Sequence, residues 1–319
     1  MEIKDYQKGD EIEILKLFKR TFKREMNPKY WEWRFANNPS GNWAIKLMWE
    51  DDLLIGHYAT SPTNLVMDDQ IVKGSLSMTT MTHPEYTGKG IFKMLANALY
   101  NDLESIHGHH FVMGFPNLNS HYGFIKNLKW QNLAVQNHIT YHYKRGSSRN
   151  TYQIRLAQGF DSQHSEILEK TLSKNSKVHT HRSLEYLRWR YDQNPNNKYR
   201  IFECYLESEF IGLLVVKEYL FTDTGAVEYF IVENGLGQEH VSAIPDVLDY
   251  ICKIDRLDEL TISTWLSPFD DRFIHYEKVG FIFVEKKPTL FCIKPYHEKF
   301  PLLEDYRNWS LSYGDSDVY

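Results

Sequence analysis

Residues 30–39 read YWEWRFANNP, and residues 186–195 read YLRWRYDQNP. Tyr, Trp, Arg, Asn and Pro recur at the same places, so Arg34 and Arg190 stand 156 residues apart. The Ile-Gly pairs at 55–56 and 211–212 keep the same offset. Because a chance match is not expected to hold one offset without a gap over about 27 residues, the chain is predicted to contain two related modules.

The two modules also end alike. Residues 124–130, FIKNLKW, resemble residues 275–281, HYEKVGF, and each reads as a helix end that leads into an apolar strand. The polar stretch KRGSSRN at 144–150 contains no apolar residue. We therefore predict a first domain over 1–145 and a second over 150–319.

In the first domain, the apolar periodicity and the turn residues predict alternating helices and strands. We expect helices over 10–24, 28–36, 90–105 and 119–128. We expect strands over 43–49, 53–60, 64–68, 72–82, 110–115 and 130–143. The segment MDDQ at 67–70 is predicted to be a hairpin turn.

Composition and charge exclude several classes of protein. The net charge is −5, and no Lys/Arg run supplies the basic field that a nucleic-acid binder needs. The chain has no apolar run near 18 residues, and residues 1–6, MEIKDY, lack the features of a signal peptide. Its three cysteines are an odd number without a CxxC pair, which favours reduced thiols in the cytoplasm. We expect neither a membrane nor a nucleic-acid partner, and the oligomeric state stays open.

The segment that carries chemistry is TTMTHPEYTGKGIF at 79–92. An apolar strand is expected to end near Pro84, and an amphipathic helix follows two loop glycines, Gly88 and Gly90. Such a loop directs backbone N–H groups and the helix dipole toward one point, where a phosphate can bind. The simpler interpretation, a helix start with two turn glycines, is favoured if the GxG pattern is taken alone.

With its context, this segment resembles the pyrophosphate loop of the GNAT superfamily of N-acetyltransferases, whose pattern is Arg/Gln-x-x-Gly-x-Gly/Ala. Thr87 stands in the Arg/Gln place and Phe92 in the last Gly/Ala place, so two of three positions depart. The flanking residues are similar to those of tandem relatives of the enhanced-intracellular-survival type. The resemblance implies an α/β (α+β) fold of two tandem GNAT-like modules, each a mixed, mostly antiparallel sheet flanked by helices.

The resemblance also implies acetyl-CoA as co-substrate and a set of contacts for it. The ligand would lie along Thr80, Met81 and Thr82 as an extra strand, and a backbone N–H near Met81 or Thr82, freed by a β-bulge, would polarise the thioester carbonyl. The segment GFPNLNS at 114–120 follows an apolar strand and would face the pantetheine arm with Asn117 and Ser120. Helix capping explains Ser120 equally well. The predicted pyrophosphate contacts are Thr87, Gly88, Lys89, Gly90, Ile91 and Phe92.

The catalytic side chains are less well defined. Relatives in this family often place a proton-donating Tyr four residues before a Gly-Phe ending, where this chain has Ile125. Tyr122 lies one helical turn earlier and is the predicted proton donor. No Asp or Glu occurs in strand 72–82, so Glu32, His57 and the tail acids 315 and 317 are weak candidates for the general base. The His-rich segment 107–110 has no neighbouring Cys or acid to complete a metal site, and no metal is expected.

The second module has the opposite pattern. It keeps the Tyr-x-x-x-Gly-Phe ending at 276–281, but its counterpart of the phosphate loop, ENGLG at 233–237, is acidic. We therefore expect no cofactor in this module. The favoured function is acetyl transfer to a primary amine of a small molecule: an amino sugar, polyamine, amino acid or antibiotic. A FemABX-type transferase fed by aminoacyl-tRNA and a non-catalytic GNAT-like binding protein are the alternatives.

Overall fold

The computed structural model describes residues 1–41, 43–221, 224–286 and 288–317. The chain forms two compact units, and each of them combines several segments of the sequence. Unit 1 comprises Met1–Leu65, Gln70–Ala134 and Thr289–Glu304, and unit 2 comprises Val66–Asp69, Val135–Pro288 and Asp305–Tyr319.

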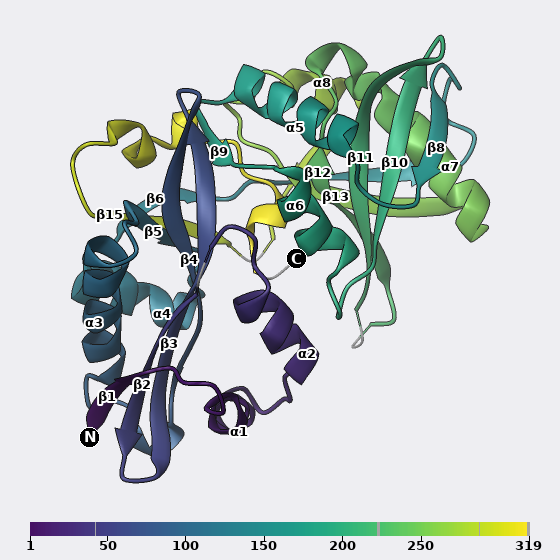
Figure 1. Cartoon of the computed structure of the whole chain (residues 1–319). Coiled ribbons are helices and arrows are strands. Elements are labelled where there is room, and N and C mark those ends of the chain that lie inside the picture. Colours follow the sequence, from purple (N-terminus) through teal and green to yellow (C-terminus); the bar gives the residue numbers. More distant parts are fainter. Residues whose placement is uncertain (42, 222–223, 287, 318–319) are drawn as a thin grey trace. The chain divides into compact units, whose positions relative to one another are not determined.

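Unit 1 is built on a mostly antiparallel sheet with the strand order β1-β2-β3-β4-β5-β15-β6 (Figure 1). Its strands are β1 (Glu2–Asp5), β2 (Ala44–Glu50), β3 (Leu53–Met67), β4 (Gln70–Thr82), β5 (Phe111–Gly114), β6 (Gln131–Val135) and β15 (Leu290–Pro295). Its helices are α1 (Glu11–Phe22), α2 (Pro28–Trp31), α3 (Ile91–Ser105) and α4 (Leu118–Tyr122), and π-helical turns extend α2 over Glu32–Ala36 and α4 over Gly123–Asn127.

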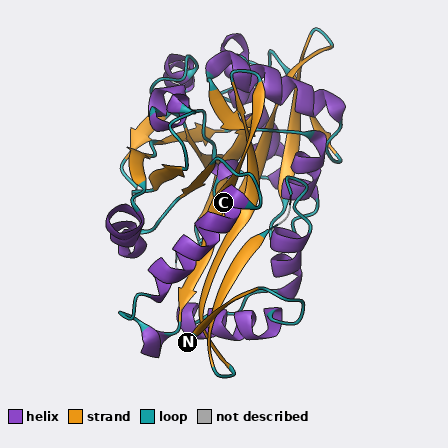
Figure 2. Cartoon of the chain, turned by 60° about the vertical axis from the view of Figure 1, so that its left-hand side comes forward, coloured by secondary structure: helices purple, strands orange, loops and turns teal. Residues whose placement is uncertain are grey.

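Unit 2 has the equivalent strand order, β8-β10-β11-β12-β13-β7-β14. Its strands are β7 (His138–Lys144), β8 (Gln153–Ala157), β10 (Tyr199–Leu206), β11 (Glu209–Leu220), β12 (Val227–Asn234), β13 (Glu259–Trp265) and β14 (Ile282–Val284), with the short β9 (Val178–Thr180) outside this order. Its helices are α5 (Ser162–Asn175), α6 (Leu184–Leu187) with a π-helical turn over Arg188–Asp192, α7 (Ile244–Asp255) and α8 (Phe273–Val279). Helices flank the strands, as Figure 2 shows.

The predicted fold class is confirmed, because both sheets are mixed and mostly antiparallel, with the parallel pairs β4–β5 and β12–β13, and are flanked by helices. The internal repeat also recurs in local structure. Both α2 and α6 continue into a π-helical turn at a constant offset of 156 residues. The β2–β3 pair shifts register between Met48 and Trp49, and the β10–β11 pair shifts between Cys204 and Tyr205, again 156 residues later.

In the two strand orders given above, each sheet contains one strand from the other half of the repeat. β7 precedes the predicted boundary at 144–150 but pairs with β13 and β14, and β15, near the end of the chain, pairs with β5. The predicted domains therefore follow the sequence repeat, whereas the compact units follow packing, and the two divisions differ mainly by the exchange of β7 and β15. Periodicity along the chain cannot reveal such an exchange, because it reports no partner for a strand.

Several predicted elements change in detail. The expected strands 53–60 and 64–68 form one strand of 15 residues, β3. The hairpin at 67–70 is present, and both of its central residues, Asp68 and Asp69, have positive φ, as a type I′ turn requires. Helix α3 buries Ile91, Leu95, Leu99 and Leu103, as expected of an amphipathic helix, and leaves Met94 exposed.

Candidate active site

The centre of the candidate site is the point in unit 1 where β4 and β5 diverge. Among the described residues, these parallel strands are in register at Ser75 with Val112 and at Leu76 with Met113. Beyond those pairs β4 continues to Thr82, while β5 ends at Gly114. From Ser77 onward this edge of β4 therefore has no partner in β5, and we call the stretch beside it, which begins at Gly114, the strand slot.

Gly114 itself contributes no side chain at the start of this slot, where the ring of Trp130 lies close by. A Cβ atom there would lie 3.5 Å from the carbonyl oxygen of Ser77, at ordinary contact distance. At the equivalent place in unit 2, after the parallel pairs of β12 and β13, stands Thr264. Its hydroxyl donates to the carbonyl oxygen of Ile231 across a distance of 3.1 Å. A side chain thus bridges the two strands in unit 2, whereas Gly114 has no side chain to form such a bridge in unit 1.

Strand β4 bends within the slot. Thr79 has φ of +50°, a left-handed conformation that is rare for a β-branched residue. The ring of His57, on the neighbouring strand β3, donates from Nδ1 to the carbonyl oxygen of Thr79 at 2.7 Å. The irregularity expected near Met81 or Thr82 is therefore centred two to three residues earlier in the strand.

A hollow of about 310 Å³ lies where the loop after β4 meets α3. Its lining comprises Thr82, Tyr86, Thr87, Gly88, Gly90, Ile91, Phe92, Lys93 and Asn127. Gly88 and Gly90 have φ of +80° and +76°, and no described heavy atom lies within 4 Å of where a Cβ would be on either of them. Gly90 is the N-cap of α3, a helix of 15 residues, so the first N–H groups of this helix adjoin the hollow.

Lys89 contributes charge beside the hollow rather than within its lining. Its ammonium lies 4.3 Å from the centroid of the Tyr86 ring, a cation–π contact. The Tyr86 hydroxyl donates to a carboxylate oxygen of Glu50, and this hydrogen bond raises the pKa of Tyr86. The Thr87 hydroxyl donates to the carbonyl oxygen of Pro84 at 3.1 Å, which closes the short turn before the glycines.

The structure thus places six of the predicted residues together around one hollow: Thr82, Thr87, Gly88, Gly90, Ile91 and Phe92. Thr80 and Met81 lie earlier on β4, and Met81 is buried. The sequence reasoning missed Tyr86, Lys93 and Asn127. Asn127 gave no signal, because it stands on a helix end that reaches the hollow only after the chain folds.

Asn117 and Ser120 have local roles in this structure. The Asn117 side chain accepts the backbone N–H groups of Asn119 and Ser120 and caps α4, and the Ser120 hydroxyl donates to Asn117. Tyr122, the predicted proton donor, is 68% exposed at the end of α4. Ile125 packs against the apolar core of unit 1.

The candidate bases differ in environment. Glu32 is exposed, and Asp315 is buried in unit 2, where it pairs with the guanidinium of Arg182 at 2.9 Å. His57 is fully buried, and its burial lowers its pKa to about 4. An ion-paired carboxylate is a poor base because protonation would break the pair. His57 is neutral at pH 7.

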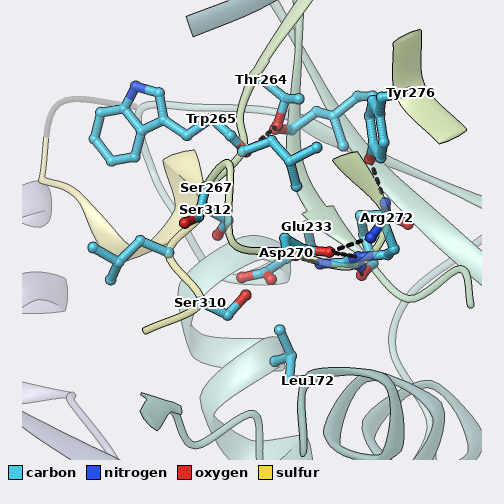
Figure 3. Close-up of a pocket in the computed structure, with 14 residues that line it drawn as sticks. Leu172, Glu233, Thr264, Trp265, Ser267, Asp270, Arg272, Tyr276, Ser310 and Ser312 are labelled. Carbon is cyan, nitrogen blue, oxygen red and sulfur yellow. Dashed lines mark hydrogen bonds and ion pairs between the residues drawn. The ribbon is translucent and has the colours of Figure 1, made fainter. Parts of the chain in front are cut away.

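The equivalent region of unit 2 is small and filled. Figure 3 shows the polar residues of its lining, among them Glu233, Thr264, Arg272 and Tyr276. The cavity that the whole lining encloses has a volume of only about 30 Å³. That space holds about one or two water molecules. The Tyr276 hydroxyl accepts a hydrogen bond from Asn234, and burial raises its pKa to about 12. The tyrosine that the family ending supplies is therefore held in a closed polar network.

Comparison with known proteins agrees with this geometry. Residues 2–132 match the family model of the acetyltransferase (GNAT) domain. The structure of a GCN5-related N-acetyltransferase from Anabaena variabilis aligns with this one with a TM-score of 0.72 at 10% sequence identity. The aligned region covers 95% of this chain and 75% of the Anabaena chain. A probable N-acyltransferase from Enterococcus faecalis has a TM-score of 0.67 at 13% identity, with coverages of 91% and 72%.

A third similar structure, a GCN5-related N-acetyltransferase from Kribbella flavida, has a TM-score of 0.67 at 12% identity, with coverages of 92% and 70%. Among curated proteins, none matches this sequence. The matched residues thus contain a GNAT acetyltransferase domain, and the chain has the fold of GCN5-related N-acetyltransferases.

Two further properties concern metals and membranes. Within the described part of the chain, no group of three or more His, Cys, Asp or Glu side chains is placed to hold a metal ion, and the His-rich segment 107–110 is included in that finding. In the same residues, every helix is too short or too polar to span a bilayer.

Proposed function

We propose that this protein is an N-acyltransferase that moves an acetyl group from acetyl-CoA to a primary amine of a small molecule. The observation that carries the proposal is the hollow of unit 1 at Gly90, which adjoins the first N–H groups of α3 and follows a strand, β4, whose edge has no partner in β5 beyond Leu76. A pantetheine arm that pairs with a strand requires the slot, and a pyrophosphate requires the N–H groups at the start of α3.

Roles follow for the residues of this strand and this hollow. The backbone N–H groups from Gly88 to Phe92 would hold the pyrophosphate, and Lys93 and Lys89 would add positive charge nearby. Thr80 to Thr82 would pair with the pantetheine arm, and an N–H after the bend at Thr79 would polarise the thioester carbonyl. Tyr122 would supply the proton to the departing thiolate, although a thiol with a pKa of about 8.5 also leaves unaided.

Unit 2 is proposed to lack a cofactor, with the tandem arrangement similar to the enhanced-intracellular-survival type. The bridge from Thr264 to Ile231 supports this, since it occupies the start of the strand gap. The turn that precedes α7, Gln238–Ala243, also contains a negatively charged side chain, that of Glu239. The Glu239 carboxylate accepts its own backbone N–H, which lowers the pKa of that carboxyl. A phosphate would meet this carboxylate at the place where unit 1 presents Gly90.

We also propose a cytoplasmic location, on the grounds of three unpaired and buried cysteines, Cys204, Cys252 and Cys292. The net charge of −5 supports a small amine rather than a nucleic acid as partner.

The experiment that tests the function combines binding with turnover. Calorimetric titration with acetyl-CoA, CoA and charged tRNA identifies the donor, and thiol release from acetyl-CoA over a panel of amino sugars, polyamines and amino acids identifies the acceptor. We expect binding of acetyl-CoA and CoA and thiol release with at least one amine. Binding of charged tRNA without CoA would refute the proposal, and CoA binding without turnover would indicate a binding protein.

A further inference from the structure

Thr79 is an exception among the described residues with a left-handed backbone. The other non-glycine residues with positive φ lie in turns, loops or helix ends: Lys23, Asp51, Asp68, Asp69, Lys129, Asn150, Glu207, Ser208 and Arg256. Thr79 alone of this described set lies inside a strand, and it alone is β-branched. Such strain persists only where surrounding contacts enforce it, and it concentrates at functional sites.

The contact that enforces it comes from His57. The 2.7 Å bond to the Thr79 carbonyl oxygen requires the proton on Nδ1, since a carbonyl only accepts. Burial keeps the ring neutral, so Nε2 carries a lone pair. This atom is shielded from solvent and has no hydrogen-bond partner among the described residues. A buried polar atom left unpaired costs free energy, so His57 is not the residue that stability alone would select.

The second unit shows what the fold uses at this place when the slot is closed. The residue 156 positions after His57 is Leu213, which is also fully buried on the equivalent strand β11. Strand β12, the counterpart of β4, has a register shift opposite Val215 and Val216, yet its eight residues, all described, have negative φ. A leucine is therefore compatible with the fold at this position. The histidine occurs in unit 1, where the strand has the left-handed residue Thr79 and the slot has no threonine bridge.

We propose that His57 is a positioning residue for acyl transfer: by holding the Thr79 carbonyl, it aims the N–H groups that follow in β4 at the thioester carbonyl of the bound acyl donor. This inference rests on the proposed function. The ring of His57 bonds to the strand and not to the donor, so it acts through the backbone of β4.

The test uses the difference between two probes, acetyl-CoA and CoA. Both would use the glycine loop, but only acetyl-CoA has the carbonyl that the aimed N–H groups contact. The variants are His57→Leu, which installs the residue of the second unit, and His57→Asn, whose side-chain amide nitrogen stands near the place of Nδ1 and preserves the donor. His57→Gln places its amide near Nε2 instead and loses that donor.

We expect the wild type to bind acetyl-CoA about fivefold more tightly than CoA, the value of one neutral hydrogen bond. His57→Leu and His57→Gln should reduce this ratio to about one while CoA binding stays within twofold of wild type. His57→Asn should keep the ratio. In thiol release, His57→Leu should lower kcat at least tenfold with little change in the KM for acetyl-CoA, and His57→Asn should restore most of the rate.

Tyr58→Phe is the matched control. Tyr58 is the next residue on β3, is fully buried, and its hydroxyl bonds to Ser77 and Tyr100 at 2.8 and 2.6 Å. Its loss should lower the melting temperature without changing the ratio of the two dissociation constants. If that control lowers the ratio as much as His57→Leu does, the effect is structural and the proposal fails.

An unchanged ratio in His57→Leu, or in His57→Gln if the leucine variant does not fold, overturns the proposal. So does a wild-type ratio of one, because no carbonyl contact would then exist to be positioned. Failure of the proposed function is distinguishable, since the wild type would then bind neither acetyl-CoA nor CoA.

Discussion

Replacing Gly114 by threonine should close the strand slot of unit 1 as Thr264 closes the equivalent gap of unit 2. The ideal Cβ at Gly114 lies 3.5 Å from the Ser77 carbonyl oxygen and 3.5 Å from the ring of Trp130. Both are ordinary contacts for a Cβ, so we expect this position to accept a side chain. A threonine in the rotamer of Thr264 would donate its hydroxyl to the Ser77 carbonyl oxygen, as Thr264 does to Ile231.

The magnitudes for stability and for binding have opposite signs. A new hydrogen bond contributes about 1 kcal/mol, and removal of a strand glycine adds about 0.5 kcal/mol through the unfolded chain. We therefore expect Gly114→Thr to raise the free energy of unfolding by about 1.5 kcal/mol. Loss of two strand-type hydrogen bonds to the pantetheine arm should cost about 2 to 3 kcal/mol, or about 30- to 150-fold in the dissociation constant for acetyl-CoA.

The assay is calorimetric titration with acetyl-CoA together with urea denaturation of each variant. The reciprocal variant Thr264→Gly is the control, because it removes the bridge in unit 2 and should lower stability by about 1 to 2 kcal/mol without changing acetyl-CoA binding. A folded Gly114→Thr protein that binds acetyl-CoA within threefold of wild type would refute the reasoning, since the slot would not then be the path of the ligand.

Three other variants test separate features of the molecule. Gly90→Ala and Gly108→Ala place a side chain at similar left-handed φ, +76° and +66°, with open space around each, so both should lose about 1 to 2 kcal/mol of stability. Only Gly90→Ala, beside the hollow, should weaken acetyl-CoA binding in calorimetry, and equal weakening in both would argue against the loop as the pyrophosphate site. Tyr122→Phe should lower kcat by about a hundredfold with an unchanged KM if its hydroxyl donates the proton, and an undiminished steady-state rate would contradict that role. Lys217 is only 6% exposed, and burial lowers its pKa from 10.5 to about 8. Its charged form therefore destabilises the folded state at pH values below 8. This cost in folding free energy disappears as the pH rises from 8 toward 10.5, the ordinary pKa of lysine. Lys217→Met should therefore raise the free energy of unfolding by about 2 to 3 kcal/mol at pH 7 and by much less at pH 10.5 in urea titrations, and an equal gain at both values would show that the charge is not penalised.

Much of the local structure could be predicted from the chain itself. The repeat at 30–39 and 186–195 predicted matching helices, and both appear with the same π-helical turn. The order of strand, glycine loop and amphipathic helix at 79–92 predicted the start of α3 within one residue. These features depend on neighbours along the chain, such as capping, side-chain spacing and glycine conformation, so local sequence carries the information.

The site could be predicted only in part. The loop residues from Thr87 to Phe92 follow from their spacing, but Asn127 reaches the same hollow from a separate helix. The roles of His57 and Gly114 could not be read from sequence, since neither belongs to a motif. Their roles depend on what they contact on β4. His57 bonds to the carbonyl oxygen of Thr79, and Gly114 lies next to the carbonyl oxygen of Ser77.

The sequence by itself determined that the chain holds two related α/β modules and that the first presents a glycine loop before an amphipathic helix. Tertiary structure alone decided that β7 and β15 are exchanged between the sheets, that Thr264 bridges two strands of unit 2 where unit 1 has Gly114, and that His57 bonds to the carbonyl of Thr79. The physical reason is that the backbone N–H and C=O groups along the edge of a strand can form hydrogen bonds with any compatible neighbouring strand. Residues within a module set its helices and turns, but the choice among strand edges is made only when the whole chain packs.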